Sequence, residues 1–169
     1  MTQEEFIEIL DEEGYSYKIE GDKIVVTHNG YVDLRSLTSL PPGVVFKNEG
    51  AVNLDSITSL PPGVVFNNEG DVDLDALTSL PPGVVFKNEG RVDLNALTSI
   101  SPGVEFKNEG YVDLESLTSL PPGVEFKNGE DVYLVYLVGG WFGEWQGNIE
   151  GIAPERLLNV MIKQGVFER

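Results

Sequence analysis

The sequence predicts a mainly β solenoid, a stack of 20-residue coils with an α-helical cap at each end. The first observation is a phrase of twenty residues, beginning as YVDLRSLTSLPPGVVFKNEG, which is written five times between residues 31 and 130. The second is that two short runs in each phrase alternate apolar and polar residues, as strands with one buried face do. The third is that helical patterns flank the repeats. Because one coil cannot bury its own apolar face, the coils must stack on one another.

Two alternating runs in each phrase define the expected strands. In the first run Val44, Phe46 and Asn48 are predicted to point inward, because the counterparts of Val44 and Phe46 never turn polar while position 45 becomes Glu in two later coils. In the second run Val32 and Leu34 alternate with charged or amide residues. Each coil should therefore contribute one strand to each of two parallel sheets.

The segments between these runs supply the corners of the coil. Leu37 and Leu40 add apolar anchors, and Pro41-Pro42-Gly43 turns the chain, since Pro restricts φ and Gly leaves it free. Glu49-Gly50 makes the opposite bend. We therefore expect one Pro-rich corner and one Gly-containing bend in every coil.

An inward amide in every coil needs a physical reason, because a buried amide without partners costs about 1 to 3 kcal/mol. We expect a ladder in which stacked Asn side chains bond to one another and to backbone groups of the bend. The only histidine, one period before the first Asn, is placed at the end of this ladder, and a ligand or proton-transfer role is its alternative. The predicted ladder consists of His28, Asn48, Asn68, Asn88, Asn108 and Asn128.

The stretch LTSLPPGVVFKN resembles the leucine-rich repeat, especially the short bacterial type with Leu-Pro before the strand and an Asn closing it. This resemblance covers the five coils only. Val44 and Phe46 stand where leucines are usual, and the run VDL is more strand-like than the convex side of most such repeats. A plain β-solenoid is the alternative, and the phrase also looks like those of uncharacterised prokaryotic and phage-type repeat proteins.

The N-terminal flank, residues 1–30, is predicted to form a helix, a hairpin and a degenerate first coil. Thr2 and Glu5 can form a capping box for a helix over residues 2–13. Two alternating runs around Glu20-Gly21-Asp22 read as a hairpin. The second of these runs matches the repeat one period later, so it begins the stack.

The C-terminal flank, residues 131–169, is predicted to form a last strand and a helical cap. Pro154 suits a first helical turn and Gly165 a helix end. Trp141 and Trp145 belong either to this cap or to an exposed aromatic site for a sugar or a partner. With both flanks assigned to the stack, residues 1–169 are expected to form a single domain.

Charge is the strongest functional signal in the composition. The chain has 28 acidic and 11 basic residues, a formal net charge of −17, and no Cys. Such a chain avoids nucleic acid and anionic membranes and is attracted to basic protein surfaces or cations. The alternative is that the negative charge only prevents the solenoids from associating with one another. The absence of Cys excludes disulfides and thiolate metal sites.

A cytoplasmic location without membrane association is expected from two features. No apolar run approaches the length of a membrane span, and the chain begins with acidic residues where a signal peptide would carry a basic segment and an apolar core.

Stacking turns each position of the phrase into a column on the surface. Two neighbouring outward columns of the second run hold seven acids and one base, and the Glu of the bend adds four acids. Eleven acids over about 24 Å give roughly one charge per 2.2 Å, near the one per 1.7 Å of duplex DNA. The lysines fall on the other sheet. The predicted partner-binding residues are Asp33, Asp55, Asp73, Asp75, Asp93, Asp113, Glu115, Tyr31 and Tyr111.

The expected function is therefore non-catalytic binding, through the acidic sheet, to a basic partner that itself binds nucleic acid. Such a nucleic-acid mimic would suit a phage-type inhibitor of a nuclease or defence complex, where the origin rests on the resemblance alone. A scaffold or adhesin that binds by shape and a Ca²⁺-binding solenoid are the alternatives, although the Gly-rich calcium loop of RTX repeats is missing. Catalysis is disfavoured because the acid pairs recur in several coils instead of forming one differentiated site. No cofactor and no metal are expected.

Overall fold

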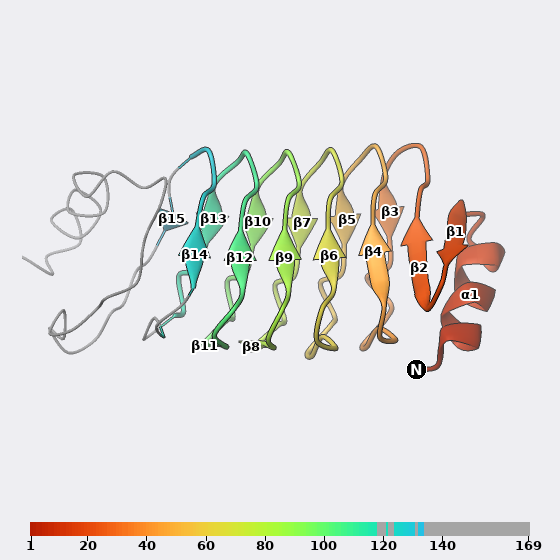
Figure 1. Ribbon diagram of the computed structural model, residues 1–169, viewed down its shortest axis with the longest axis horizontal. Helices are drawn as coiled ribbons and strands as arrows, with labels where there is room; N and C mark the ends of the chain where they lie inside the picture. The colour runs from red at the N-terminus through yellow and green to blue at the C-terminus, as the bar shows by residue number, and fades with distance from the viewer. Residues whose placement is uncertain (118–120, 122–123, 131, 134–169) are drawn as a thin grey trace, which may run out of the picture.

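The computed structural model describes residues 1–117, 121, 124–130 and 132–133 of the chain (Figure 1). The described part is a mainly β solenoid of stacked 20-residue coils that begins with one helix, as the sequence predicts. Figure 1 shows the coils side by side along the long axis, with the helix α1 (Gln3–Glu12) at one end. The expected C-terminal helix and the two tryptophans lie outside the described residues.

The first sheet has seven strands in the order β1-β2-β4-β6-β9-β12-β14. β1 pairs antiparallel with β2 as the predicted hairpin, and all later neighbours pair parallel. Partners lie one phrase apart, as in Phe46 opposite Phe66. The strands are β1 (Tyr17–Glu20), β2 (Lys23–Val26), β4 (Val44–Phe46), β6 (Val65–Phe66), β9 (Val85–Phe86), β12 (Glu105–Phe106) and β14 (Glu125–Phe126).

The second sheet has six parallel strands of two residues each, in the order β15-β13-β10-β7-β5-β3. Its register is again one phrase, so Val72 pairs with both Val52 and Val92. The strands are β3 (Val32–Asp33), β5 (Val52–Asn53), β7 (Val72–Asp73), β10 (Val92–Asp93), β13 (Val112–Asp113) and β15 (Val132–Tyr133).

A third, two-stranded sheet at the Pro-rich corner was not predicted. It joins β8 (Ser79–Leu80) to β11 (Ser99–Ile100). The Ser101 N–H donates to the Leu80 carbonyl at 2.9 Å and extends this pairing. The other four coils carry Pro at the position of Ser101, and Pro has no N–H to donate. A single substitution in the phrase thus accounts for a ladder bond that only this coil can make.

Identical core residues from successive coils stack in columns between the two main sheets. The rings of Phe46, Phe66, Phe86, Phe106 and Phe126 are almost completely buried and nearly parallel, with centroids 4.8 to 5.3 Å apart. The Val and Leu residues that the two runs predict to be inward are buried as well. Because every coil places the same shapes at the same height, packing is repeated along the axis.

The conserved phrase position occupied by Asn forms a second buried column. The Asn48 side-chain amide donates from Nδ2 to the carbonyls of Gly30, Gly50 and Ala51 at 3.0, 2.7 and 3.3 Å. The same three-carbonyl pattern recurs in the next three coils. The expected bonds from the amides to backbone groups of the bend are therefore present. The bonds that were also expected between the amides themselves are not found among the described residues, because the carbonyls of the bend take the N–H groups.

The bend also needs Gly for close approach between coils. A Cβ atom at Gly110 would lie 2.7 Å from the backbone nitrogen of Arg91, which follows the bend one turn earlier along the chain. That separation is shorter than real Cβ atoms show. The Gly therefore lets neighbouring bends stack at strand spacing.

The N-terminal helix covers the first coil. The predicted capping box is present, with Thr2 Oγ1 accepting from the Glu5 N–H at 3.2 Å and Glu5 accepting from the Thr2 N–H at 2.6 Å. Phe6 and Leu10 are fully buried against the core. At the edge of the second sheet the Tyr15 hydroxyl accepts a hydrogen bond from the Asp33 N–H at 2.9 Å. The helix and this tyrosine together close the N-terminal end of the stack.

His28 lies at the end of the Asn column, where the sequence placed it, and it is half-buried. Its ring meets Tyr15 edge-on at a centroid separation of 5.0 Å, and its backbone carbonyl accepts from the Glu49 N–H at 3.1 Å. The end of the column is thus made by an aromatic contact. No helix within the described ranges is long and apolar enough to cross a membrane.

Candidate partner-binding surface

The outer face of the six-stranded sheet carries the acidic columns that the sequence predicts. Asp73 pairs in register with Asn53 on one side and Asp93 on the other, and Asp93 pairs with Asp113. The flanking Val and Leu residues are buried, so alternation turns the acids outward. We call this surface the acidic face. It comprises Asp33, Asp55, Asp71, Asp73, Asp75, Asp93, Asp113 and Glu115, together with Arg35 and Arg91.

The central column of the acidic face is less exposed than an outward position suggests. Asn53 and Asp93 are each only 7% exposed, and the side chain of Asp73 is 23% exposed. Stacking at strand spacing makes each side chain shield the next, and Arg91 lies over two of the acids. The neighbouring column is more open, with Asp75 and Glu115 exposed.

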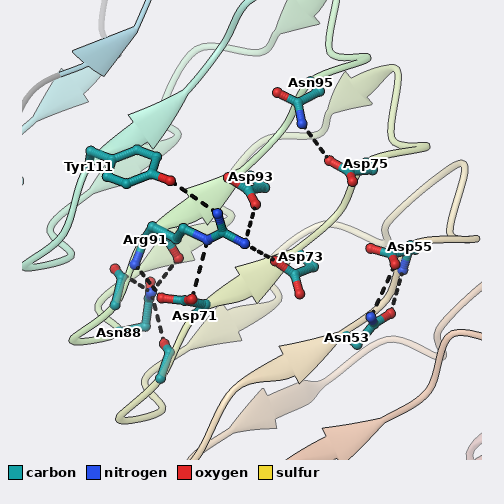
Figure 2. A network of polar contacts seen from close by, with 12 residues as sticks. Asn53, Asp55, Asp71, Asp73, Asp75, Asn88, Arg91, Asp93, Asn95 and Tyr111 are labelled. Atoms are coloured by element: carbon teal, nitrogen blue, oxygen red, sulfur yellow. Dashed lines mark hydrogen bonds and ion pairs between the residues drawn. The ribbon is translucent and has the colours of Figure 1, made fainter.

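Arg91 is the centre of the polar network on this face (Figure 2). Its Nη2 lies 2.9 Å from Asp93 Oδ2 and 3.6 Å from Asp73 Oδ1, and its Nε lies 3.2 Å from Asp71 Oδ2. Its Nη1 donates to the Tyr111 hydroxyl at 3.1 Å. One guanidinium therefore serves three carboxylates from two neighbouring coils.

A smaller cluster of the same kind occupies the first coil. Arg35 Nε lies 2.8 Å from Asp33 Oδ1, and Arg35 Nη2 donates to the Tyr31 hydroxyl at 3.2 Å. Tyr31 and Tyr111, both predicted as contact residues, thus hold arginines on the face. Tyr31 remains 45% exposed.

Sequence reasoning missed Arg91 and Asp71 as members of this surface. They occupy the first position of the phrase, two residues before the central column, and residues two apart on a strand share a face. Aligning the five phrases at that position predicts one further outward column, which consists of Tyr31, Ala51, Asp71, Arg91 and Tyr111. The missed column supplies the only base near the centre of the face.

Amide side chains separate some of the acids along the columns. Asn53 Nδ2 donates to Asp55 Oδ2 at 3.0 Å, and Asn95 Nδ2 donates to Asp75 Oδ1 at 2.8 Å. Both bonds keep an acid in place without removing its charge. Figure 2 shows these two bonds, which orient Asp75 on the exposed part of the column and Asp55 where it is half-buried.

The electrostatics of the central column differ from those of an isolated carboxylate. Burial raises the pKa of Asp93 to about 6, with Arg91 opposing this shift and the charges of Asp73, Asp75 and Asp113 adding to it. Burial likewise raises the pKa of Asp73 and of Asp113. Ionisation of Asp73, Asp93 and Asp113 is therefore less favourable than ionisation of an aspartate in water.

Asp33, at the end of the same column, behaves in the opposite way. Its side-chain hydrogen bond with Arg35 lowers its pKa below the ordinary value. A dedicated base two residues along the chain therefore stabilises the Asp33 carboxylate, whereas Asp93 shares Arg91 with other acids.

The outer face of the seven-stranded sheet is different in kind. Val45, Val65 and Val85 are half-buried there, and Lys107 forms an ion pair with Glu105 of the same strand region. A side-chain hydrogen bond with Lys107 lowers the pKa of Glu105. The two sheets of one stack thus present faces of different charge.

Among the residues that the structure describes, no group of three or more His, Cys, Asp or Glu side chains is arranged to hold a metal ion. Most acids of the face have an Arg or Asn partner, and Asp113 accepts a hydrogen bond from the Glu115 N–H at 3.1 Å. Chemically, the arrangement is suited to attracting cationic groups along a line of carboxylates.

Comparison of the chain with protein-family models, with curated proteins and with solved structures found no match.

Proposed function

We propose that the protein is a non-catalytic binding protein whose acidic face engages a basic surface on a partner protein. The observation that carries the proposal is the register of Asp73, Asp93 and Asp113 on neighbouring parallel strands. Like charges directly opposite each other in a sheet destabilise it. With neutral residues at these positions the sheet would form with less repulsion. Binding to a cationic partner would explain why acids are present there despite this cost.

The sharper form of the proposal is mimicry of a nucleic-acid backbone. The columns repeat at the strand spacing of about 4.8 Å, whereas each strand of duplex DNA carries one phosphate per about 3.4 Å of axis. Arg35 and Arg91 neutralise part of the acidic face. In the described part of the chain, two pairs of acids without an arginine partner remain, namely Asp55 with Asp75 and Asp113 with Glu115. A groove lined with Lys and Arg would accept such a line of anions.

We further propose that the repeats are divergent relatives of short leucine-rich repeats. A phage-type inhibitor that acts in the cytoplasm against a nuclease or defence complex would benefit from mimicking a nucleic-acid backbone. No catalytic step is part of this proposal. The stacked coils support the repeat architecture, and the acidic face supports the mode of binding.

The test uses core histones as a basic, nucleic-acid-binding probe. The face variant D55K/D75K/E115K reverses three acids without touching the Arg91 network. The matched control E8K/E12K/E13K makes the same change of net charge on or beside α1, where all three acids are exposed. Circular dichroism and urea unfolding establish that both variants are folded.

The wild-type protein and the control should bind histones with an affinity that falls as salt rises, and the face variant should bind about tenfold more weakly. Equal losses in the two variants would show that net charge alone drives binding, which contradicts the proposed face. Duplex DNA should displace the protein from histones if the two compete for one groove. Lysozyme, a basic protein without such a groove, should bind more weakly than histones. Binding by shape alone would show little dependence on salt.

A further inference from the structure

Two carboxylates on the acidic face lie on neighbouring strands because of the register of the sheet. Asp73 on β7 lies directly opposite Asp93 on β10 in a parallel pair. A single nitrogen, Arg91 Nη2, lies 2.9 Å from Asp93 and 3.6 Å from Asp73 (Figure 2). The longer of these distances exceeds hydrogen-bond length, so Arg91 serves Asp93 better than Asp73.

One oxygen of the pair, Asp73 Oδ1, is buried and lacks a hydrogen-bond donor among the described residues. Arg91 is already engaged with Asp71, Asp93 and Tyr111. A buried acceptor without a donor is unfavourable, and a hydrogen on the facing carboxyl group would supply the missing donor.

We propose that Asp73 and Asp93 together form a proton-binding site, which takes up one proton in mildly acidic solution and so reduces the charge at the centre of the acidic face. The protonated carboxyl group donates to the facing carboxylate, and Arg91 keeps the remaining negative charge paired. The ionisable groups that surround the pair on β5, β7, β10 and β13 and in the residues next to them are Asp55, Asp71, Asp75, Arg91, Tyr111, Asp113 and Glu115.

The electrostatic balance of these neighbours favours proton uptake. Burial raises the pKa of Asp93 to about 6, and the facing Asp73 contributes to that rise. Burial also raises the pKa of Asp73. Arg91 opposes both shifts but carries one charge against the three carboxylates it meets. When two carboxylates interact this closely, the proton belongs to the pair.

The consequence for partner binding rests on the proposed function, whereas proton uptake itself does not. A cationic partner should bind less well when the centre of the face has lost one charge. Because an oligolysine peptide keeps its charge throughout the range from pH 5 to 7, any change in its binding reports on the protein.

The proton site is tested by following the side-chain carboxyl ¹³C shifts of Asp73 and Asp93 through a pH titration. Both carbons should move together with an inflection near pH 6 in the wild type and in the control E115Q. In D93N the Asp73 carbon should titrate at clearly lower pH, because the Asn amide donates to it and one negative charge is gone. Separate inflections for the two residues below about pH 5 would overturn the proposal.

Binding of the oligolysine peptide at pH 5 and pH 7 then separates the two proposals. The wild type should bind about fivefold more weakly at pH 5, as expected for one lost ion pair, while D93N should show little change. A shared inflection near pH 6 without any peptide binding would support the proton site and count against the proposed function. Peptide binding without that inflection would do the reverse.

Discussion

The two main sheets are built from the same coils and share one core, yet their outer faces differ in charge. On the seven-stranded sheet, half-buried valines alternate with lysines, and Glu105 pairs with a base in its own strand region. On the six-stranded sheet, acids face acids in register, and Arg91 alone serves three of them. Inward positions are nearly identical from coil to coil, whereas the outward positions of the six-stranded sheet vary.

This difference indicates that the inward positions of the repeat determine folding, whereas the outward positions are available for recognition. The Phe and Asn columns place the same side chains at every contact between neighbouring coils, so these columns provide most of the stability of the stack. The outward columns are then free to differ, because a surface side chain away from special contacts changes stability little. Three of the variations below change the shared core or one of the outer faces, and the fourth changes a corner outside both main sheets.

The largest effect should come from breaking the shared core. Phe86→Ala removes the middle ring of the Phe column and should lower the free energy of unfolding by about 3 to 5 kcal/mol. Phe86→Leu is the matched control and should cost less because it leaves a smaller cavity. Urea unfolding measures both. Equal costs would show that the stacked column does not hold the sheets together.

A second variation concerns the pH dependence that only the acidic face should show. An acid whose pKa is higher in the folded protein than in the unfolded chain binds more protons when folded. For Asp93, the free energy of unfolding should therefore be highest below about pH 4 and fall as pH rises towards 6, by at most about 3 kcal/mol. D93N should lose most of this slope, and the remote E8Q should keep it. A wild-type stability that rises from pH 4 to 6 would contradict the assignment.

The third variation compares one base from each sheet. Arg91→Gln leaves Asp71, Asp73 and Asp93 without their shared cation and should cost about 1 to 3 kcal/mol. Lys107→Gln breaks one partly exposed ion pair and should cost less than about 1 kcal/mol. Thermal and urea unfolding of both variants at pH 7 measure the contrast. Equal costs would mean that Arg91 is no more than another surface base.

The smallest effect should come from the corner that belongs to neither main sheet. Ser101→Pro restores the residue of the other coils and removes the hydrogen bond from the Ser101 N–H to the Leu80 carbonyl. The expected cost is about 1 kcal/mol, with no effect on binding at the acidic face. Ser101→Ala keeps the N–H and should be nearly neutral, so hydrogen exchange of that amide and urea unfolding can separate the two.

Much of the fold could be predicted from the sequence because the repeat converts spacing directly into register. The inward residues, the two sheets, the capping box and the hairpin all follow from patterns of period 2, 3.6 and 20. The third sheet depended on one residue, Ser101, whose significance appears only when strands are already paired. The bonds from the Asn amides to the bend were predicted, but the additional bonds between neighbouring amides were wrongly expected, because a side-chain pattern does not reveal how many carbonyls of the bend point at each amide.

The candidate surface was predicted as columns but not as a network. Register placed Asp73, Asp93 and Asp113 together, as the phrases imply. The partial burial of Asp93 and the reach of Arg91 across neighbouring strands depend on side-chain conformation, which spacing does not specify. Charge counted along the sequence therefore overstated how freely the central acids are exposed.

The most direct test of the contrast between the sheets is to map where a cation binds. Amide chemical shifts would be recorded while the oligolysine peptide is added to the wild-type protein at pH 7. The account predicts that the shifts change along β5, β7, β10 and β13 and stay nearly constant along β4, β6, β9 and β12. Changes of equal size on both sheets, or changes confined to the acids of α1, would contradict the claim that the acidic face is the binding surface.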